Sequence, residues 1–127
     1  GNVLLDHLHG ATVEHRAGIS GEVHAPGIGV LPMPIEETFH RIALEALNNS
    51  LRHAQGDRVD IILLEEEGDL IMTIVDNGIG FDREAAANSG GMGLEGMQKR
   101  IGKVSGFLTL SSSSEGTWVT ARAPLKQ

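Results

Sequence analysis

The stretch MTIVDNGIGFD, residues 72–82, places an apolar run directly before an aspartate and two glycines. The apolar and β-branched residues predict a strand that ends in Asp76, which would hold this carboxylate on rigid backbone. Gly78 and Gly80 have no side chains, which permits positive φ angles and lets a ligand approach the backbone closely. The pattern suits a ligand whose amino group donates to Asp76, and it suits equally a glycine-rich turn in which Asp76 makes a local hydrogen bond. Both interpretations are open for this stretch alone.

The residues around this stretch predict two antiparallel hairpins. The first joins residues 58–65 to 69–76 across the acidic turn EEGD, and the second joins 107–113 to 117–125 across the turn SSEG. In each run apolar and polar residues alternate, as in strands with one buried face. A further short strand is expected around residues 19–24.

Helical spacing of apolar residues identifies the remaining elements. The strongest helix begins at Pro34 and stops before Gly56, and a shorter one covers 94–104. A weaker pattern over 3–16 is interrupted by Gly10. The mixture predicts an α+β fold, a two-layer α/β sandwich whose mixed, largely antiparallel sheet is covered on one face by about three helices.

Composition narrows the class of protein. With 127 residues, 40% of them apolar, the chain is expected to form a single domain over residues 1–127. Its net charge of −7 and 3% aromatic content argue against a nucleic-acid partner. The absence of cysteine excludes disulfides, thiolate metal sites and Cys nucleophiles. No apolar run is long enough to span a bilayer, so we expect a cytoplasmic domain without direct membrane contact. Because the sequence starts abruptly at GNVLLDHLHG, we also expect it to be a fragment of a longer protein.

The long helix carries a polar stripe beside its apolar stripe. Glu45, Asn49, Arg52 and His53 recur at helical spacing and share one side of the helix. This stripe borders the apolar one, so it would place a carboxylate, an amide and a cation at the rim of the core. The alternative is a solvated ladder of Glu, Asn and Arg on the surface.

A glycine cluster precedes the shorter helix. Gly90, Gly91 and Gly93 would leave unpaired N–H donors at the helix start, which is a site suited to phosphate. The cluster matches neither the GxxxxGK[ST] phosphate loop nor a Rossmann fingerprint, since no βαβ unit surrounds it. By itself it is weak support for a phosphate site.

Taken together, these elements resemble the GHKL ATPases with the Bergerat fold, which include histidine kinases, gyrase-type topoisomerases and mismatch-repair ATPases. EALNNSLRHA resembles the N box, DNGIGFD the G1 box and GGMGLEGMQKR the G2 box, while EGTWVTARAPL resembles the closing strand. The resemblance covers residues 34–125. Within the superfamily, the segments GLEGMQKRI and SGFLTLSSSSEGTWV are especially similar to the catalytic ATP-binding domains of nitrate-sensor-type histidine kinases.

The resemblance implies a site for ATP and Mg²⁺. Asn49 would be the metal ligand, and Glu45 the catalytic residue that orients a water or acts as a base. Asp76 would accept a hydrogen bond from the adenine amino group. The other implied ATP-binding residues are Arg52, His53, Gly78, Ile79, Gly80, Gly91, Gly93, Leu94 and Thr117. The chain departs from the family pattern in its short lid, Arg83–Gly90, and in Glu95, which stands where the subfamily often has a basic residue.

The implied function is phosphorylation of a histidine on a separate dimerisation domain of the same kinase, which in turn would act on a response regulator. His7 does not fit the acceptor role, because no second long helix fits between it and Pro34. The phosphoacceptor is therefore expected outside this chain. Two alternatives stay open: a stand-alone anti-sigma-factor-type serine kinase, and a non-catalytic module that senses ATP.

Overall fold

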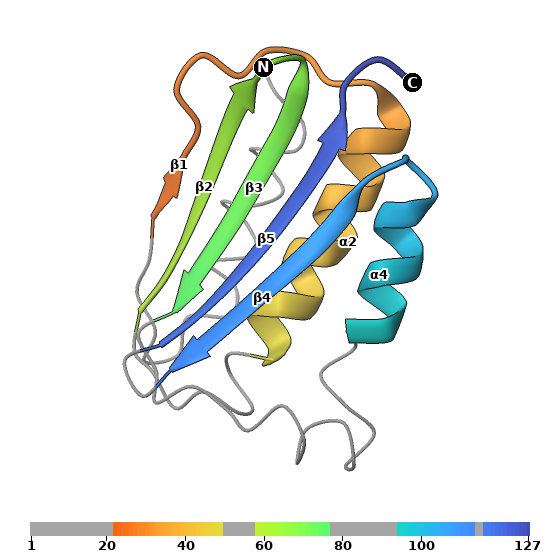
Figure 1. Cartoon of the computed structure of the whole chain (residues 1–127). Coiled ribbons are helices and arrows are strands. Elements are labelled where there is room, and N and C mark those ends of the chain that lie inside the picture. The colour runs from red at the N-terminus through yellow and green to blue at the C-terminus, as the bar shows by residue number, and fades with distance from the viewer. Residues whose placement is uncertain (1–21, 50–57, 77–93, 114–115) are drawn as a thin grey trace.

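The computed structural model of the chain describes residues 22–49, 58–76, 94–113 and 116–127, with only the backbone described at 47–49, 94 and 112–113. These residues form one five-stranded sheet with two helices on the same face (Figure 1). The elements are β1 (Val23–His24), α2 (Met33–Asn49), β2 (Val59–Glu66), β3 (Asp69–Asp76), α4 (Leu94–Gly102), β4 (Phe107–Ser113) and β5 (Gly116–Pro124).

The sheet has the strand order β1-β2-β3-β5-β4. β1 runs parallel to β2, and all other neighbours are antiparallel. The last strand of the chain, β5, therefore lies between β3 and β4. Its first residues stand directly beside the last residues of β3, since Thr117 pairs with Asp76 and Pro124 with Asp69.

The β2–β3 hairpin turns through two residues with positive φ, Glu67 at 53° and Gly68 at 82°. Positive φ at both central residues is the type I′ geometry, whose twist matches that of the flanking strands. The N–H of Leu125 donates to the carbonyl of Gly68 at 2.9 Å, which fixes the end of β5 to this turn. Arg122 Nε also donates to Asp69 Oδ2 at 2.7 Å, and this bond raises the pKa of the Arg122 guanidinium.

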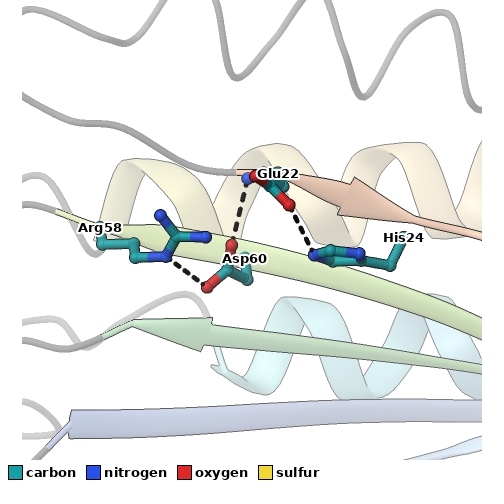
Figure 2. Close-up of polar contacts among 4 residues, drawn as sticks. All are labelled: Glu22, His24, Arg58 and Asp60. Atoms are coloured by element: carbon teal, nitrogen blue, oxygen red, sulfur yellow. Dashed lines mark hydrogen bonds and ion pairs between the residues drawn. The ribbon is translucent and has the colours of Figure 1, made fainter.

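β1 is held at the sheet edge by a side chain as well as by the backbone (Figure 2). Asp60 Oδ1 accepts the backbone N–H of Glu22 at 3.1 Å, and Asp60 Oδ2 accepts Arg58 Nε at 2.9 Å. The N–H of Ile61 donates to the carbonyl of Glu22 at 2.9 Å. Glu22 also contacts His24 Nε2 at 3.2 Å on the exposed surface. Because a strand of two residues has few backbone hydrogen bonds to its neighbour, the Asp60 carboxylate adds a further contact that holds this segment to β2.

The core lies between the helices and the sheet. α2 buries Ile35, Phe39 and Ile42 with no exposed surface, at the three- and four-residue spacing of one helical face. α4 buries Met97 and Ile101 in the same way. The strands contribute alternate residues to this layer: Val59, Ile61, Leu63, Leu70, Met72, Ile74, Leu108, Val119, Ala121 and Ala123. Full burial of each large side chain contributes about 1.5–3 kcal/mol. The apolar side chains of each strand therefore face the helices, and the residues between them face away.

α4 ends in a Schellman arrangement. The N–H of Gly106 donates to the carbonyl of Ile101 at 2.9 Å, and the N–H of Ser105 donates to that of Gly102 at 3.1 Å. Ser105 takes the positive φ of 62° that this arrangement requires. Gly106 is needed for a different reason: a Cβ there would lie 2.4 Å from the carbonyl oxygen of Arg122 and 2.8 Å from the Cβ of Ala123. The turn can therefore press directly against β5.

The fold class and the two hairpins expected from the sequence are confirmed, and one face of the sheet carries helices as predicted. The strand expected around residues 19–24 is described at Val23–His24. The long helix is described as far as Asn49, and the shorter one ends at Gly102, with Val104 buried in the following turn. The weak helical pattern over residues 3–16 lies outside the described residues.

Candidate functional site

Asp76 is a carboxylate in a position that the rest of its strand fills with apolar side chains. The helix-covered row of β3 consists of Leu70, Met72 and Ile74, each at most 2% exposed, and Asp76 is next in this row at 5% exposed. Alternation along a strand requires residues two apart to share a face, so Asp76 lies on the core side at the end of β3. Because a carboxylate is costly to bury unless it is hydrogen-bonded, its place there calls for polar neighbours.

Thr117 occupies the matching position on the next strand. It is the Cα partner of Asp76 in the β3–β5 register and is 3% exposed. Asp76 and Thr117 are the two polar or charged residues buried within the described part of the chain. Neither lacks an interaction partner. They bring a carboxylate and a hydroxyl, one acceptor and one donor–acceptor group, to one edge of the core.

Asp76 and Thr117 lie at an end of the molecule where several helices and strands begin or end. Figure 1 shows that α2 and β3 end there and that β5 and α4 begin there. The half-buried Glu45 lies one turn before Asn49, the last residue of α2. Leu94 is the first residue of α4. The structure thus places five of the residues predicted from the sequence on the same end: Glu45, Asn49, Asp76, Leu94 and Thr117.

The other predicted residues lie outside the described part of the chain. These are Arg52, His53, Gly78, Ile79, Gly80, Gly91 and Gly93. Asn49 and Leu94 are described by their backbone alone. The predicted contacts to a phosphate group and the predicted geometry of the base pocket therefore stay predictions.

The predicted magnesium ligand is the side-chain amide of Asn49, a residue of which only the backbone is described. Among the residues that the structure describes, no three His, Asp or Glu side chains gather in a way that could hold a metal ion. A site of the predicted kind needs no such group, since Mg²⁺ retains several waters and is commonly bound through few protein oxygens together with substrate phosphates.

One surface feature was not predicted from the sequence. A hollow of about 510 Å³ lies over α2 and α4, lined by Glu37, Thr38, His40, Arg41, Leu44 and Arg100. Arg100 lies in the last turn of α4, where a positive charge complements the helix dipole. Nothing in the sequence indicated that Arg41 and Arg100 line one hollow, because this depends on how α2 and α4 pack.

A family model for the histidine kinase-, DNA gyrase B- and HSP90-like ATPases matches residues 35–127. This chain belongs to that family. The match includes both described helices except the first residues of α2, and all strands except β1.

Similar curated proteins are sensor histidine kinases. The sensor histidine kinase MctS of Rhizobium johnstonii is 36% identical over 112 residues, which is 86% of this chain and 24% of that protein. The oxygen sensor histidine kinase NreB of Staphylococcus carnosus is 37% identical over 92 residues, or 72% of this chain and 26% of that protein. The chain thus spans about a quarter of the length of these relatives.

Solved structures support the fold. The histidine kinase domain of the blue-light-activated kinase EL346 from Erythrobacter litoralis matches with a TM-score of 0.80 at 24% identity, covering 98% of this chain and 60% of that one. The likeness confirms the arrangement of helices and strands. In the described ranges, neither helix combines the length and the apolar character that crossing a bilayer requires.

Proposed function

We propose that this chain is the catalytic domain of a sensor histidine kinase, which binds Mg-ATP and supplies the γ-phosphoryl group for a histidine on a separate dimerisation domain. The observation that carries the proposal is the buried pair of Asp76 and Thr117 at the end of the sheet where α2 ends and α4 begins. The family membership and the sensor-kinase relatives support it.

In the proposed complex Asp76 binds the adenine base of ATP. Its carboxylate accepts the amino group of adenine, and the hydroxyl of Thr117 beside it serves a neighbouring ring nitrogen or a bridging water. Hydrogen bonds to a charged group contribute about 1.5–3 kcal/mol, more than neutral ones. Burial of Asp76 at 5% exposure keeps water from competing for this contact. Gly78, Ile79 and Gly80 would form the wall that the base approaches.

The phosphate groups belong at the start of α4 in this proposal. Peptide N–H groups in the first turn of a helix have no intrahelical partner and point along its axis, so they favour an anion there. Gly91, Gly93 and Leu94 would supply these donors, while Arg52, with His53 nearby, would add positive charge. The acidic Glu95 in the first turn weakens the local positive potential, so backbone N–H groups and Arg52 would carry most of the binding.

Asn49 and Glu45 would act on the phosphoryl group that is transferred. The amide oxygen of Asn49 is the proposed magnesium ligand, and the ion would neutralise charge on the phosphates during transfer. Glu45, one helical turn away, would hold a water or take the proton of the attacking group. Positioning and charge neutralisation dominate phosphoryl transfer, so a small set of fixed groups suffices.

The proposed partners are a dimerisation domain with the phosphoacceptor histidine and, through it, a response regulator. The proposed location of this domain is the cytoplasm. Whether the full-length kinase is anchored to a membrane depends on its other segments. A serine kinase of the same superfamily is the second candidate, and a module that only senses ATP is the third. The relatives named as sensor histidine kinases favour the first of these.

The test uses the 127-residue chain, ATP labelled at the γ-phosphoryl group, and a separately purified dimerisation domain of a sensor histidine kinase. We expect Mg²⁺-dependent labelling of that domain, and the label should be lost in acid and retained in alkali, as phosphohistidine is. An acid-stable label would support the serine kinase instead. Tight ATP binding without transfer to any supplied domain would support the sensing module.

A further inference from the structure

The hollow over α2 and α4 lies apart from the proposed nucleotide site. Arg41 stands two turns before the end of α2, and Arg100 is in the last turn of α4, whereas the proposed site lies where α2 ends and α4 begins. At about 510 Å³ the hollow is within the range of ligand pockets. None of the described residues that line it is fully buried, so a partner can reach these residues without opening the core.

Two arginines from different helices, Arg41 of α2 and Arg100 of α4, line this hollow. Arg41 and Arg100 are both exposed, and in the part of the chain that the structure describes neither takes part in an ion pair. The chain carries 17 acidic and 10 basic residues, so an excess of carboxylates was available to neutralise them. Two unpaired guanidinium groups in one hollow of an acidic protein leave a local positive charge that a carboxylate partner fits, since the planar guanidinium binds carboxylates in a bidentate manner.

The surroundings of the arginines add apolar contact. Leu44 is half-buried in the lining, and Met33 is 70% exposed at the start of α2. Met33, Glu37, Arg41 and Leu44 follow one another at spacings of three and four residues, so they lie along one side of the helix. An exposed methionine beside arginines is a common composition of protein–protein contact surfaces.

We propose that the hollow docks an acidic amphipathic helix of another protein chain. Helices pack with their axes about 8–10 Å apart, so a third helix lying over the groove between two neighbours can reach both with side chains three or four residues apart. Its carboxylates would bind Arg41 and Arg100, and its apolar residues would cover Leu44 and Met33. Glu37, which also lines the hollow, would favour one orientation of the helix by pairing with a basic residue or repelling an acidic one.

The experiment uses the whole 127-residue chain labelled with ¹⁵N and follows the Nε–Hε resonances of its arginines. The probe is a helical alanine-rich peptide with pairs of glutamates four residues apart and leucines on the same face. A second peptide carries glutamine at each glutamate. We expect the acidic peptide to shift the resonances of Arg41 and Arg100, and the glutamine peptide to leave them unchanged.

Matched variants separate the hollow from general charge attraction. The double variant R41Q/R100Q and the control K103Q/K126Q remove the same charge from exposed positions, and only the first pair lines the hollow. We expect the dissociation constant of the acidic peptide to rise about tenfold or more in the first variant, the order expected for losing two charge-assisted contacts, and to change little in the control.

Three outcomes would overturn the proposal: equal shifts with both peptides, shifts confined to Arg58 and Arg122, or equal weakening by the two double variants. Vesicles containing phosphatidylserine form a further arm. If they shift Arg41 and Arg100 as strongly as the peptide does, the surface recognises anionic lipid and the docking of a helix is wrong.

Discussion

Asp76, the last residue of β3, lies opposite Thr117, the second residue of β5, and both side chains lie on the buried face of the sheet. The next pair along, Val75 and Trp118, points to the other face, where Trp118 is 38% exposed. A slip of one residue in this register would put Asp76 opposite an outward-facing side chain. The buried core of β3 and β5 prevents that slip, so the packing of Leu70, Met72 and Ala121 also keeps the two polar groups together.

Replacing Thr117 with valine tests the polar pair from the side of β5. Valine keeps the size of the side chain and removes the hydroxyl, and we expect ATP affinity to fall about fivefold, since a neutral hydrogen bond contributes roughly 1 kcal/mol. Thr120→Val is the matched control, because Thr120 lies on the opposite face of the same strand against Thr73. Isothermal titration with ATP measures both. Equal losses in the two variants would argue against a specific role for the Thr117 hydroxyl.

Gly106→Ala tests the contact between the end of α4 and β5. The added Cβ would lie 2.4 Å from the carbonyl oxygen of Arg122 and 2.7 Å from Ile101 Cγ1, so the turn must move away from β5. We expect a loss of about 1–3 kcal/mol in the free energy of unfolding, as for other overpacked sites. Gly102→Ala, where a Cβ meets nothing within 4 Å, should be neutral or stabilising by up to about 1 kcal/mol. Urea denaturation distinguishes the two variants, and equal effects would contradict the packing described at Gly106.

Asp60→Ala should loosen β1 without unfolding the rest of the sheet. The carboxylate accepts the N–H of Glu22, and the same segment accepts the N–H of Ile61 through the carbonyl of Glu22. Losing the first bond should increase the rate of hydrogen exchange at Ile61 while leaving that of Met72, in the centre of β3, unchanged. Asp60→Asn is the control, because its amide oxygen can still accept the Glu22 N–H. Slow exchange at Ile61 in the alanine variant would show that β1 does not depend on Asp60.

The sequence allowed prediction of those parts of the fold that local pattern determines. Alternation predicted the run that ends in Asp76, and helical spacing predicted the face that buries Ile35 and Phe39. The insertion of β5 between β3 and β4 was beyond local pattern, because pairing between distant strands depends on their combined burial. The same holds for Thr117, whose predicted role came only from family resemblance, while its place opposite Asp76 comes from strand register.

Two further features show the same limit. The sequence predicted no close contact at Gly106, because the need for glycine arises from the neighbouring strand and the positive φ falls on Ser105 instead. The presence of Arg41 and Arg100 in the lining of one hollow likewise arises from the packing of α2 against α4. Both are relations between elements, which composition and spacing along one element do not contain.

The central claim is that the buried Asp76 carboxylate binds the base of ATP, and titration of ATP into Asp76→Asn tests it most directly. The single tryptophan of the chain, Trp118, follows Thr117 and is opposite Val75, so its fluorescence and the heat of binding give two independent readouts. Asp69→Asn, at the other end of β3, is the matched control. With circular dichroism showing both variants folded, we predict a dissociation constant raised by about ten- to a hundredfold in Asp76→Asn, from the loss of a charge-assisted hydrogen bond, and little change in Asp69→Asn. Equal ATP affinity in Asp76→Asn and the natural chain would contradict the account.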